Sequence, residues 1–430
     1  MPLFQRAEPQ ETDDSWSFNQ LRRTQTSYLT HDYHRYPAKF IPQLAERLIK
    51  ENSKSEDLIC DPFMGSGTTL LEALLNSRRT YGSDINPVSV LISRAKTTPI
   101  EPNYLKDQTS LVLEKINADL ENRTEAMIIF GAAVFSSIIP DNKKIDYWFP
   151  EEQKIDLAII LSRINCVDDE DIRTFLLCGF SNILKACSRW MTRSTKPTIE
   201  KHKIIASAYR SFTLQIKRMS IKNEDLWNRI GGKQASCVIY NNDARRINLE
   251  NESATLIITS PPYVTSYEYT DLHQLSAIWL RYIDKLSDFR SKFIGSVHKA
   301  SHDGNLYSKL AMKIVDDLGI INIRESKAVG QYFFEMQECF REMHRILKHG
   351  GRTCIIIGDT QLRRVSIYNA HVFIESMHEI GFKTHRVIKR AIPNKILPLT
   401  RDEGTGRFCK TIRANRLAYP TEYILIMEKV

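Results

Sequence analysis

A short segment near the middle of the chain has the composition of a rigid polar turn. Residues Thr259–Tyr263 read TSPPY and directly follow the apolar run Ala254–Ile258. Two consecutive prolines cannot donate ladder hydrogen bonds and fix their own φ angles, so the chain must leave a strand here in one stiff shape. Such a turn presents backbone carbonyls in fixed directions, with a serine hydroxyl and a tyrosine ring beside them. It is suited to holding the hydrogens of an amino group in place.

Three aspartates stand where predicted strands end. Asp61 opens DPFMGSGTT, in which Gly65 and Gly67 allow a tight turn before a helix start, whose free N–H groups can meet a carboxylate or phosphate. Asp84, in YGSDINP, ends the next strand, where an acidic residue can accept both hydroxyls of a ribose. Asp243, in YNNDARRI, ends a third strand. Three carboxylates at one sheet edge predict a pocket for an adenosine-containing ligand.

The elements that must position these residues alternate between strand and helix at both ends of the chain. This alternation predicts βαβ units and a parallel sheet. Between about 100 and 233 the pattern is mostly helical, so a helical block is expected between neighbouring strands. The stretch 329–348 predicts a long amphipathic helix that is ended by Gly350 and Gly351. The expected units are a polar leader (1–30), a catalytic domain (31–99 and 234–430), a helical insertion (100–233) and a smaller insertion (285–328).

Composition limits the classes of protein to be considered. The chain has 430 residues and a formal charge of +9, from 60 Lys and Arg against 51 Asp and Glu, which favours an anionic partner, nucleic acid first. Its eight cysteines show no C-x-x-C spacing and no short pairing with histidines, which argues against a disulfide framework and a zinc site. No signal-like or membrane-spanning apolar stretch occurs, so we expect a cytoplasmic protein that binds no metal and no membrane.

The quoted segments, taken together, resemble the motifs of the S-adenosylmethionine-dependent DNA amino-methyltransferases. The resemblance covers about 31–98, 235–283 and 331–430, and HRYPAKFIPQLAERLI is similar to the segment that packs on the methionine end of the cofactor. It implies an α/β fold, a doubly wound Rossmann-like methyltransferase sheet whose last strand is antiparallel, carrying a mostly helical inserted domain. It also implies S-adenosylmethionine as cofactor. The cofactor-binding residues carried over are Phe40, Asp61, Phe63, Gly65, Ser66, Gly67, Thr68, Asp84, Ile85, Asp243, Ala244 and Thr259.

In that family, the aspartate at the place of Asp61 faces the amino acid part of the cofactor, and Phe63 sits beside it. Asp84 binds the ribose, and Asp243 with Ala244 lies by the adenine. For Asp243, a role as a helix cap or turn former is the alternative. Phe40 has the alternative of an ordinary core residue.

The resemblance makes the TSPPY turn a clamp for the amino group of a base, with Ser260, Pro261, Pro262 and Tyr263 as catalytic residues. The carbonyl between the prolines and the serine hydroxyl would hold the amine, and the tyrosine ring would stack on a base flipped out of the duplex. A deprotonating residue is not required before attack, because the developing ammonium loses its proton readily afterwards. The first clamp residue is serine here, instead of aspartate or asparagine.

Serine at the first clamp position resembles the subgroup that acts on N4 of cytosine, whereas some members with serine act on N6 of adenine. Many cytosine-N4 enzymes carry the clamp before the cofactor turn, and this sequence departs from that order. The departure leaves open which segment recognises the target sequence, and the helical insertion (100–233) is the candidate.

Basic residues concentrate in two segments. The segment from Lys185 to Arg218 contains nine basic residues and a single acidic residue, Glu200, with aromatic residues interleaved. Such a stripe can neutralise phosphates, although a solvated basic face of a helical domain is the alternative. A second basic loop spans 400–416 and has glycines for mobility. The expected nucleic-acid-binding residues are Arg189, Trp190, Arg193, Lys196, Lys201 and Lys203, with Arg407, Lys410 and Arg413 in the second loop.

The sequence therefore predicts a site-specific methyltransferase acting on N4 of cytosine in double-stranded DNA, within a restriction-modification or other defence system that includes a cognate endonuclease. An adenine-N6 DNA methyltransferase is one alternative. A tRNA guanosine-N2 methyltransferase is another, but these enzymes normally have aspartate at the place of Ser260 and a sizeable RNA-binding domain before the cofactor turn. A non-catalytic nucleic-acid-binding module is the third, and the intact turn and clamp argue against it.

Overall fold

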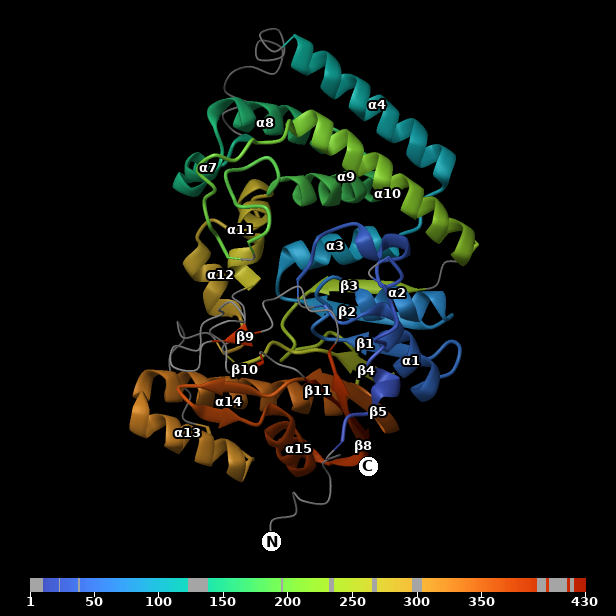
Figure 1. Cartoon of the computed structure of the whole chain (residues 1–430). Helices are drawn as coiled ribbons and strands as arrows, with labels where there is room; N and C mark the ends of the chain where they lie inside the picture. Colours follow the sequence, from blue (N-terminus) through green and yellow to red (C-terminus); the bar gives the residue numbers. More distant parts are fainter. Residues whose placement is uncertain are drawn as a thin grey trace.

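A seven-stranded mixed sheet forms the centre of the molecule (Figure 1). In order across the sheet, its strands are β3 (Cys237–Asn241), β2 (Arg79–Asp84), β1 (Leu58–Asp61), β4 (Ala254–Thr259), β5 (Leu347–Ile357), β11 (Thr421–Lys429) and β8 (Phe382–Ala391). Only β11 runs antiparallel to its neighbours, β5 and β8. This topology confirms the predicted doubly wound fold with an antiparallel last strand.

The structure is a computed structural model, and it describes most of the chain. The described residues are 11–22, 24–37, 39–122, 138–194, 196–231, 236–264, 269–295, 304–392, 400–401, 416–417 and 421–430. Among them, no helix combines the length and the apolar character that crossing a membrane requires.

The two faces of the sheet are covered by different helices, as the alternation of side chains along a strand demands. On one face, Leu256 and Ile258 of β4 pack with Leu44 and Leu48 of α1. On the other face, Ile257 packs with the long helix α14 and with α13 and α15. The helices named here are α1 (Pro42–Asn52), α13 (Lys309–Ile321), α14 (Ile323–Ile346) and α15 (Asn369–Ile380).

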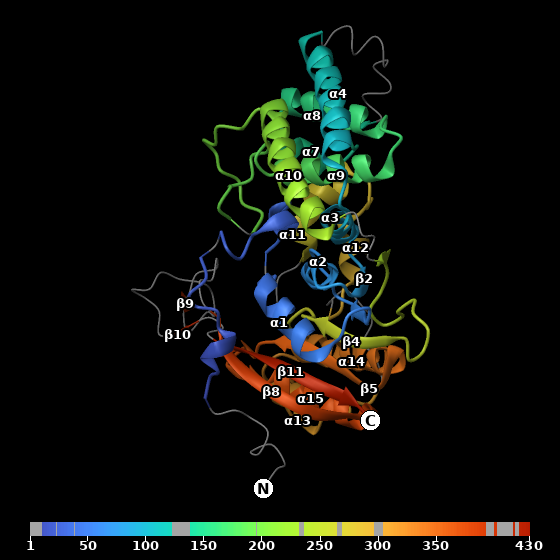
Figure 2. The ribbon, with the colours of Figure 1, turned by 90° about the vertical axis from the view of Figure 1, so that its right-hand side faces the viewer.

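Two helices follow the strands that carry the first two aspartates, and a helical layer packs on the second of them. α2 (Thr68–Leu75) follows β1, and α3 (Pro87–Thr97) follows β2. One continuous core joins α3 to the helices of the segment 100–233 and to α11, which follows the TSPPY turn. Figures 1 and 2 both place this layer at one end of the molecule, opposite α13 and α15. Its helices are α4 (Pro102–Glu121), α7 (Lys143–Trp148), α8 (Glu151–Asn165), α9 (Glu170–Ile183), α10 (Ala208–Ile230), α11 (Tyr269–Trp279) and α12 (Leu286–Lys292).

Short elements complete the described structure. They are the 3₁₀ helices η2 (Asp14–Trp16) and η3 (Leu29–Asp32) and the strands β6 (Thr360–Leu362), β7 (Val365–Ile367), β9 (Thr400–Arg401) and β10 (Arg416–Leu417). The predicted domain boundaries stay a prediction.

The predicted end of the helix at 329–348 is wrong. α14 ends at Ile346, and the buried Leu347 already belongs to β5. Gly350 and Gly351 lie within that strand, where Leu347 pairs with Ala254 and Arg352 already pairs with Leu256. The residues between them therefore bulge out of the ladder, and a Cβ on Gly351 would come within 2.8 Å of the Lys348 carbonyl oxygen. These glycines serve a β-bulge and not a helix cap.

The N-terminal segment packs against the sheet at Trp16, which is fully buried in the core that α1 shares with β8 and β11. The guanidinium carbon of Arg47 lies 3.7 Å from the centroid of the Trp16 ring, and Arg390 donates a hydrogen bond to the Trp16 carbonyl over 2.8 Å. Within the predicted polar leader, Trp16 thus packs against one face of the sheet.

We expect Trp16→Ala to lower the free energy of unfolding by about 3 to 5 kcal/mol, because it removes a large buried ring and leaves a cavity. Chemical denaturation followed by circular dichroism measures this loss. Trp16→Phe is the matched control and should cost less. An unchanged unfolding midpoint for Trp16→Ala would show that the N-terminal segment does not pack on the sheet in solution.

Candidate active site

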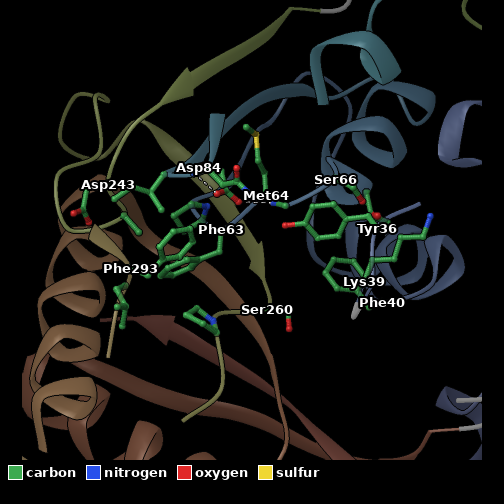
Figure 3. A pocket seen from close by; sticks show the side chains of 18 of the residues that line it. Tyr36, Lys39, Phe40, Phe63, Met64, Ser66, Asp84, Asp243, Ser260 and Phe293 are labelled. Atoms are coloured by element: carbon green, nitrogen blue, oxygen red, sulfur yellow. Dashed lines mark hydrogen bonds between the residues drawn. The ribbon is translucent and has the colours of Figure 1, made fainter. Parts of the chain in front are cut away.

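A pocket opens at the carboxyl ends of β1, β2, β3 and β4, where parallel strands commonly place ligands (Figure 3). Its empty space is about 810 Å³ when the open mouth is included. The predicted residues that line it are Phe40, Phe63, Gly65, Ser66, Thr68, Asp84, Ile85, Asp243, Ala244, Ser260 and Pro262. The structure thus brings together segments that lie far apart in the sequence.

The turn between β1 and α2 is held in place from behind by α3. Gly65 and Gly67 have positive φ angles of 49° and 70°, and a Cβ on Gly67 would come within 2.8 Å of Ser93 Oγ. Ser93 Oγ donates to the Gly65 carbonyl over 3.0 Å, and Lys96 Nζ donates to the Ser66 carbonyl over 2.5 Å. These two side chains fix the turn by its carbonyls. They were not predicted, because nothing in their spacing distinguishes them from other helical residues.

Two hydroxyl groups in the turn are left without a partner inside the described part of the chain. Ser66 and Thr68 are buried and line the pocket. Within the described residues, Ser66 Oγ and Thr68 Oγ1 neither donate nor accept a hydrogen bond. A buried polar group without a partner is costly, so such groups indicate a ligand that satisfies them. Tyr36, Lys39 and Phe40 lie at the same end of the pocket (Figure 3). Lys39 Nζ already donates to the His31 carbonyl over 2.7 Å, whereas the two hydroxyls suit a carboxylate.

Asp84 lies midway along the pocket and is fixed by its neighbours. Its Oδ2 accepts from the Gly65 N–H over 2.9 Å, and its Oδ1 accepts from the Asn86 N–H over 2.8 Å. Burial raises the pKa of Asp84 to about 7. Each carboxylate oxygen has a further lone pair, so the ionised side chain can still accept two hydroxyl groups.

The far end of the pocket is formed by Asp243 and by aromatic side chains. Arg245 Nη2 donates to Asp243 Oδ2 over 2.5 Å, so this carboxylate is paired within the protein. Phe63 and Phe293 lie at the same end (Figure 3). Phe293, together with Lys292 and Ile294, comes from the end of α12 and the residues after it, within the predicted smaller insertion. No sequence signal marked these three residues.

Asp61, Gly67 and Thr259 do not line the pocket. Asp61 is buried, and its Oδ1 accepts from Thr259 Oγ1 over 2.7 Å and from the Phe63 N–H over 3.1 Å. Burial raises the pKa of Asp61 to about 6. Asp61 therefore ties the end of β1 to the end of β4, while Gly67 caps the start of α2.

The TSPPY turn contributes Ser260 and Pro262 to the pocket, whereas Pro261 is buried and does not line it. Tyr332 Oη donates to the Pro262 carbonyl over 2.7 Å. Tyr263 faces away from the lining residues, since its Oη donates to Glu422 Oε2 over 3.4 Å and its ring lies against Gly358. The predicted stacking role of Tyr263 stays a prediction.

Part of the predicted nucleic-acid set has a structural role. Trp190 is buried, stacks on Trp148 with ring centroids 5.1 Å apart and donates from Nε1 to the Lys196 carbonyl over 3.0 Å. Lys203 Nζ donates to three carbonyl groups, one of them that of Trp190 over 2.7 Å. Arg189 donates to the Tyr147 carbonyl over 2.9 Å. These residues hold a loop, which we call the basic hairpin (residues 189–203).

The exposed residues of the basic hairpin are Arg193, Lys196 and Lys201. The hairpin is attached beside the pocket, because Arg35 Nη1 donates to the Thr192 carbonyl over 3.1 Å and the next residue, Tyr36, lines the pocket. The second predicted group, Arg407, Lys410 and Arg413, lies outside the described residues. Across the described ranges, no cluster of histidine, cysteine or acidic residues could hold a metal ion.

Comparisons with known proteins show which family the chain resembles. The profile of the N6/N4 DNA methylase family matches residues 4–94 and 254–430, more than half of the chain. Type II methyltransferase M.MvaI of Kocuria varians is 29% identical over 405 residues, 87% of each chain. Type II methyltransferase M.MjaII of Methanocaldococcus jannaschii is 24% identical over 371 residues, 67% of this chain and 69% of that one.

Among solved structures, a SAM-dependent methyltransferase of Methanosarcina mazei aligns with a TM-score of 0.31 at 8% identity, covering 89% of this chain and 97% of that chain. This alignment is too distant to bear on function. The family match covers both the glycine turn after β1 and the TSPPY turn after β4. The chain therefore belongs to the N6/N4 family of S-adenosylmethionine-dependent DNA methyltransferases.

Proposed function

We propose that the protein transfers a methyl group from S-adenosylmethionine to the exocyclic N4 amine of cytosine in a specific sequence of double-stranded DNA. The observation that carries the proposal is that Ser260 and Pro262 line the same pocket as Ser66, Thr68 and Asp84. The clamp and the cofactor residues thus share one space. A place in a restriction-modification or other defence system, beside a cognate endonuclease, is part of the proposal.

The pocket residues fit S-adenosylmethionine in type and order. Ser66 and Thr68, whose hydroxyls have no partner in the described structure, would hold the carboxylate. Asp84 would accept the ribose hydroxyls, and Phe63 with Ala244 would contact the adenine. The cofactor, when bound, supplies a methyl group that its sulfonium centre makes electrophilic.

The clamp makes the amine a better nucleophile. The lone pair of an exocyclic amine is delocalised into the base, and acceptors that hold both hydrogens favour a tetrahedral nitrogen. Ser260 Oγ lines the pocket and is the first acceptor we assign. The Pro261 carbonyl, which belongs to a residue behind the lining, is assigned as the second, because the Pro262 carbonyl already accepts from Tyr332. The nitrogen then loses one proton to water, so the chain need not supply a base. The target base must leave the duplex to reach this pocket.

Adenine N6 is the second candidate, because the same clamp can hold either amine. The family includes both chemistries in its name, and the DNA adenine methyltransferase YhdJ of Escherichia coli is 26% identical over 109 residues, 25% of this chain. The preference for cytosine rests on serine at position 260. Family membership argues against the RNA methyltransferase alternative.

We expect labelled N4-methylcytosine when DNA is incubated with the protein and isotopically labelled S-adenosylmethionine and then digested to nucleosides. Ser260→Ala should lower the rate by about 10²-fold or more, because it removes one pre-positioned group at the amine. Ser55→Ala, at an exposed position before β1 that the pocket does not include, is the matched control. Labelled N6-methyladenine would overturn the choice of base, and label confined to transfer RNA would overturn DNA as the substrate.

The pKa of Asp84 predicts how cofactor binding depends on pH. Because burial raises this pKa to about 7, the side chain is protonated below that pH and can no longer accept both hydroxyl groups. We expect the Kd for S-adenosylhomocysteine to be constant above about pH 7 and to rise by up to about tenfold per pH unit below it. Isothermal titration calorimetry measures the profile. A Kd that does not change across this range would remove Asp84 from the ribose site.

We further propose that the basic hairpin contacts DNA phosphates through Arg193, Lys196 and Lys201. These side chains are exposed, and the hairpin that carries them is tied to Arg35, next to the pocket residue Tyr36. Trp190, Lys203 and Arg189 hold the hairpin together, and their predicted contacts with DNA stay a prediction. Arg407, Lys410 and Arg413 stay candidates for DNA binding.

Arg193→Gln combined with Lys196→Gln should weaken DNA binding and reduce the slope of log K against log salt by about 1.8, since each lost phosphate contact removes about 0.9. Fluorescence anisotropy at several salt concentrations measures the slope. Lys106→Gln combined with Lys115→Gln, on exposed positions of α4, removes the same charge elsewhere and should leave the slope unchanged. Equal slopes for both double variants would contradict the role of the hairpin.

A further inference from the structure

One turn of α14 contacts the site at two separate places. Tyr332 and Glu335 lie three residues apart, so they project from the same side of the helix. Both are buried in the core between α14 and the sheet, with exposed fractions of 2% and 0%. Tyr332 reaches the clamp, and Glu335 reaches the wall at the Asp243 end of the pocket. Neither residue belongs to the motifs at the strand ends.

Tyr332 fixes the direction of a clamp carbonyl. Its Oη donates to the Pro262 carbonyl over 2.7 Å. The φ angles of Pro261 and Pro262 are locked by their rings, so a bond at the second carbonyl leaves little freedom for the first. The Tyr332 ring is itself confined, because it stacks on Phe373 with centroids 6.4 Å apart and a Cβ on Gly295 would come within 3.1 Å of it. The bond from Tyr332 thereby restricts the direction of the Pro261 carbonyl, which we assign to the amine.

Glu335 fixes the wall at the Asp243 end of the pocket. Its Oε2 accepts from the Gly295 N–H over 2.6 Å, directly after the pocket residues Phe293 and Ile294. Its Oε1 accepts from Arg245 Nη1 over 2.7 Å, and the same guanidinium holds Asp243. A fully buried carboxylate needs such a charged partner and N–H donors. Glu335 therefore ties together the two segments that close this end of the pocket.

We propose that Tyr332 and Glu335 are positioning residues, which set the clamp and the wall at the Asp243 end relative to each other from one helical turn. The inference rests on the proposed function, because it concerns where that site holds the target amine. Methyl transfer is sensitive to small misplacement of the reacting groups. Because one rigid helix contacts both the clamp and the wall at the Asp243 end, the clamp keeps a fixed position relative to the cofactor pocket.

The two residues should affect different steps. Tyr332→Phe removes one hydroxyl and keeps the ring, so kcat for methyl transfer to DNA should fall about tenfold as the clamp loosens. Its Kd for S-adenosylmethionine should stay within about twofold, because the wall is unchanged. Tyr33→Phe is the matched control, since the Tyr33 hydroxyl is also buried but has no partner within the described ranges. It should leave both quantities unchanged.

Glu335→Gln should act on the cofactor. The glutamine oxygen can still accept from Gly295, but one of the two carboxylates that balance Arg245 is lost, so the wall loosens. We expect the Kd for S-adenosylmethionine to rise about tenfold, with kcat at saturating cofactor within about twofold of wild type. Glu338→Gln, one turn further along α14, is the matched control. Equilibrium dialysis with labelled cofactor and single-turnover transfer give the two readouts, and thermal unfolding is followed for every variant.

Three results would overturn the positioning role. The first is that Tyr332→Phe changes mainly Kd and Glu335→Gln mainly kcat, and the second is a wild-type kcat in Tyr332→Phe. The third is a parallel loss of kcat and cofactor affinity that follows a lowered Tm. A wild-type protein that transfers no label to DNA would overturn the proposed function and the inference together. An active wild type with an equally active Tyr332→Phe would overturn the inference alone.

Discussion

The site depends on one buried hydrogen bond, from the Thr259 hydroxyl to the carboxylate of Asp61. Asp61 is the last residue of β1 and precedes the glycine turn, while Thr259 is the last residue of β4 and precedes the clamp. The two strands are neighbours and run parallel, so the starts of the two turns are one strand spacing apart, about 4.8 Å. The bond fixes that separation at the point where the chain leaves the sheet. Every other contact around the pocket refines a geometry that this pair establishes.

Behind the glycine turn, a buried polar layer stabilises the loop without a large buried charge. Lys96 reaches the Ser66 carbonyl, and burial lowers the pKa of its ammonium group. His31 Nε2 lies 2.7 Å from Glu72 Oε1. Burial lowers the pKa of His31 and raises that of Glu72 to about 8, so both groups favour their uncharged forms near neutral pH. A layer of this kind avoids the large desolvation penalty of buried ions. It lets α3 hold the turn by its carbonyls while Ser66 and Thr68 keep their hydroxyls for the ligand.

Sequence reasoning located the strand ends, because the carboxyl ends of parallel strands meet at one sheet edge and motifs placed there must converge. It could not separate residues that line the pocket from residues that support it. Asp61 and Asp84 look alike in the sequence, yet one faces the neighbouring strand and the other the pocket. Lys203 and Lys201 are both basic, but only the structure shows that the first donates to buried carbonyls.

The contacts made by residues outside any motif could not be predicted from the sequence, for a different reason. Phe293 lies in a polar insertion, and Tyr332 sits in an amphipathic helix whose pattern indicates only burial. Periodicity shows which side of a helix is covered and not which atom of a distant turn it meets. The Gly350–Gly351 pair shows the same limit, since glycine suits a helix end and a β-bulge equally well.

The helical layer is joined to the site through the helices that follow the motifs themselves. α3 follows the strand that ends at Asp84, and α11 follows the TSPPY turn, and both contribute to the core of this layer. Polar contacts reinforce the link, since Asn86 in the pocket wall donates to His273 of α11 over 2.8 Å, and Ser276 of the same helix meets Ser181 of α9 over 2.7 Å. The helical layer therefore cannot turn relative to the pocket without moving the residues that form it. DNA held by the layer would be placed against the clamp by the same helices that place the cofactor residues.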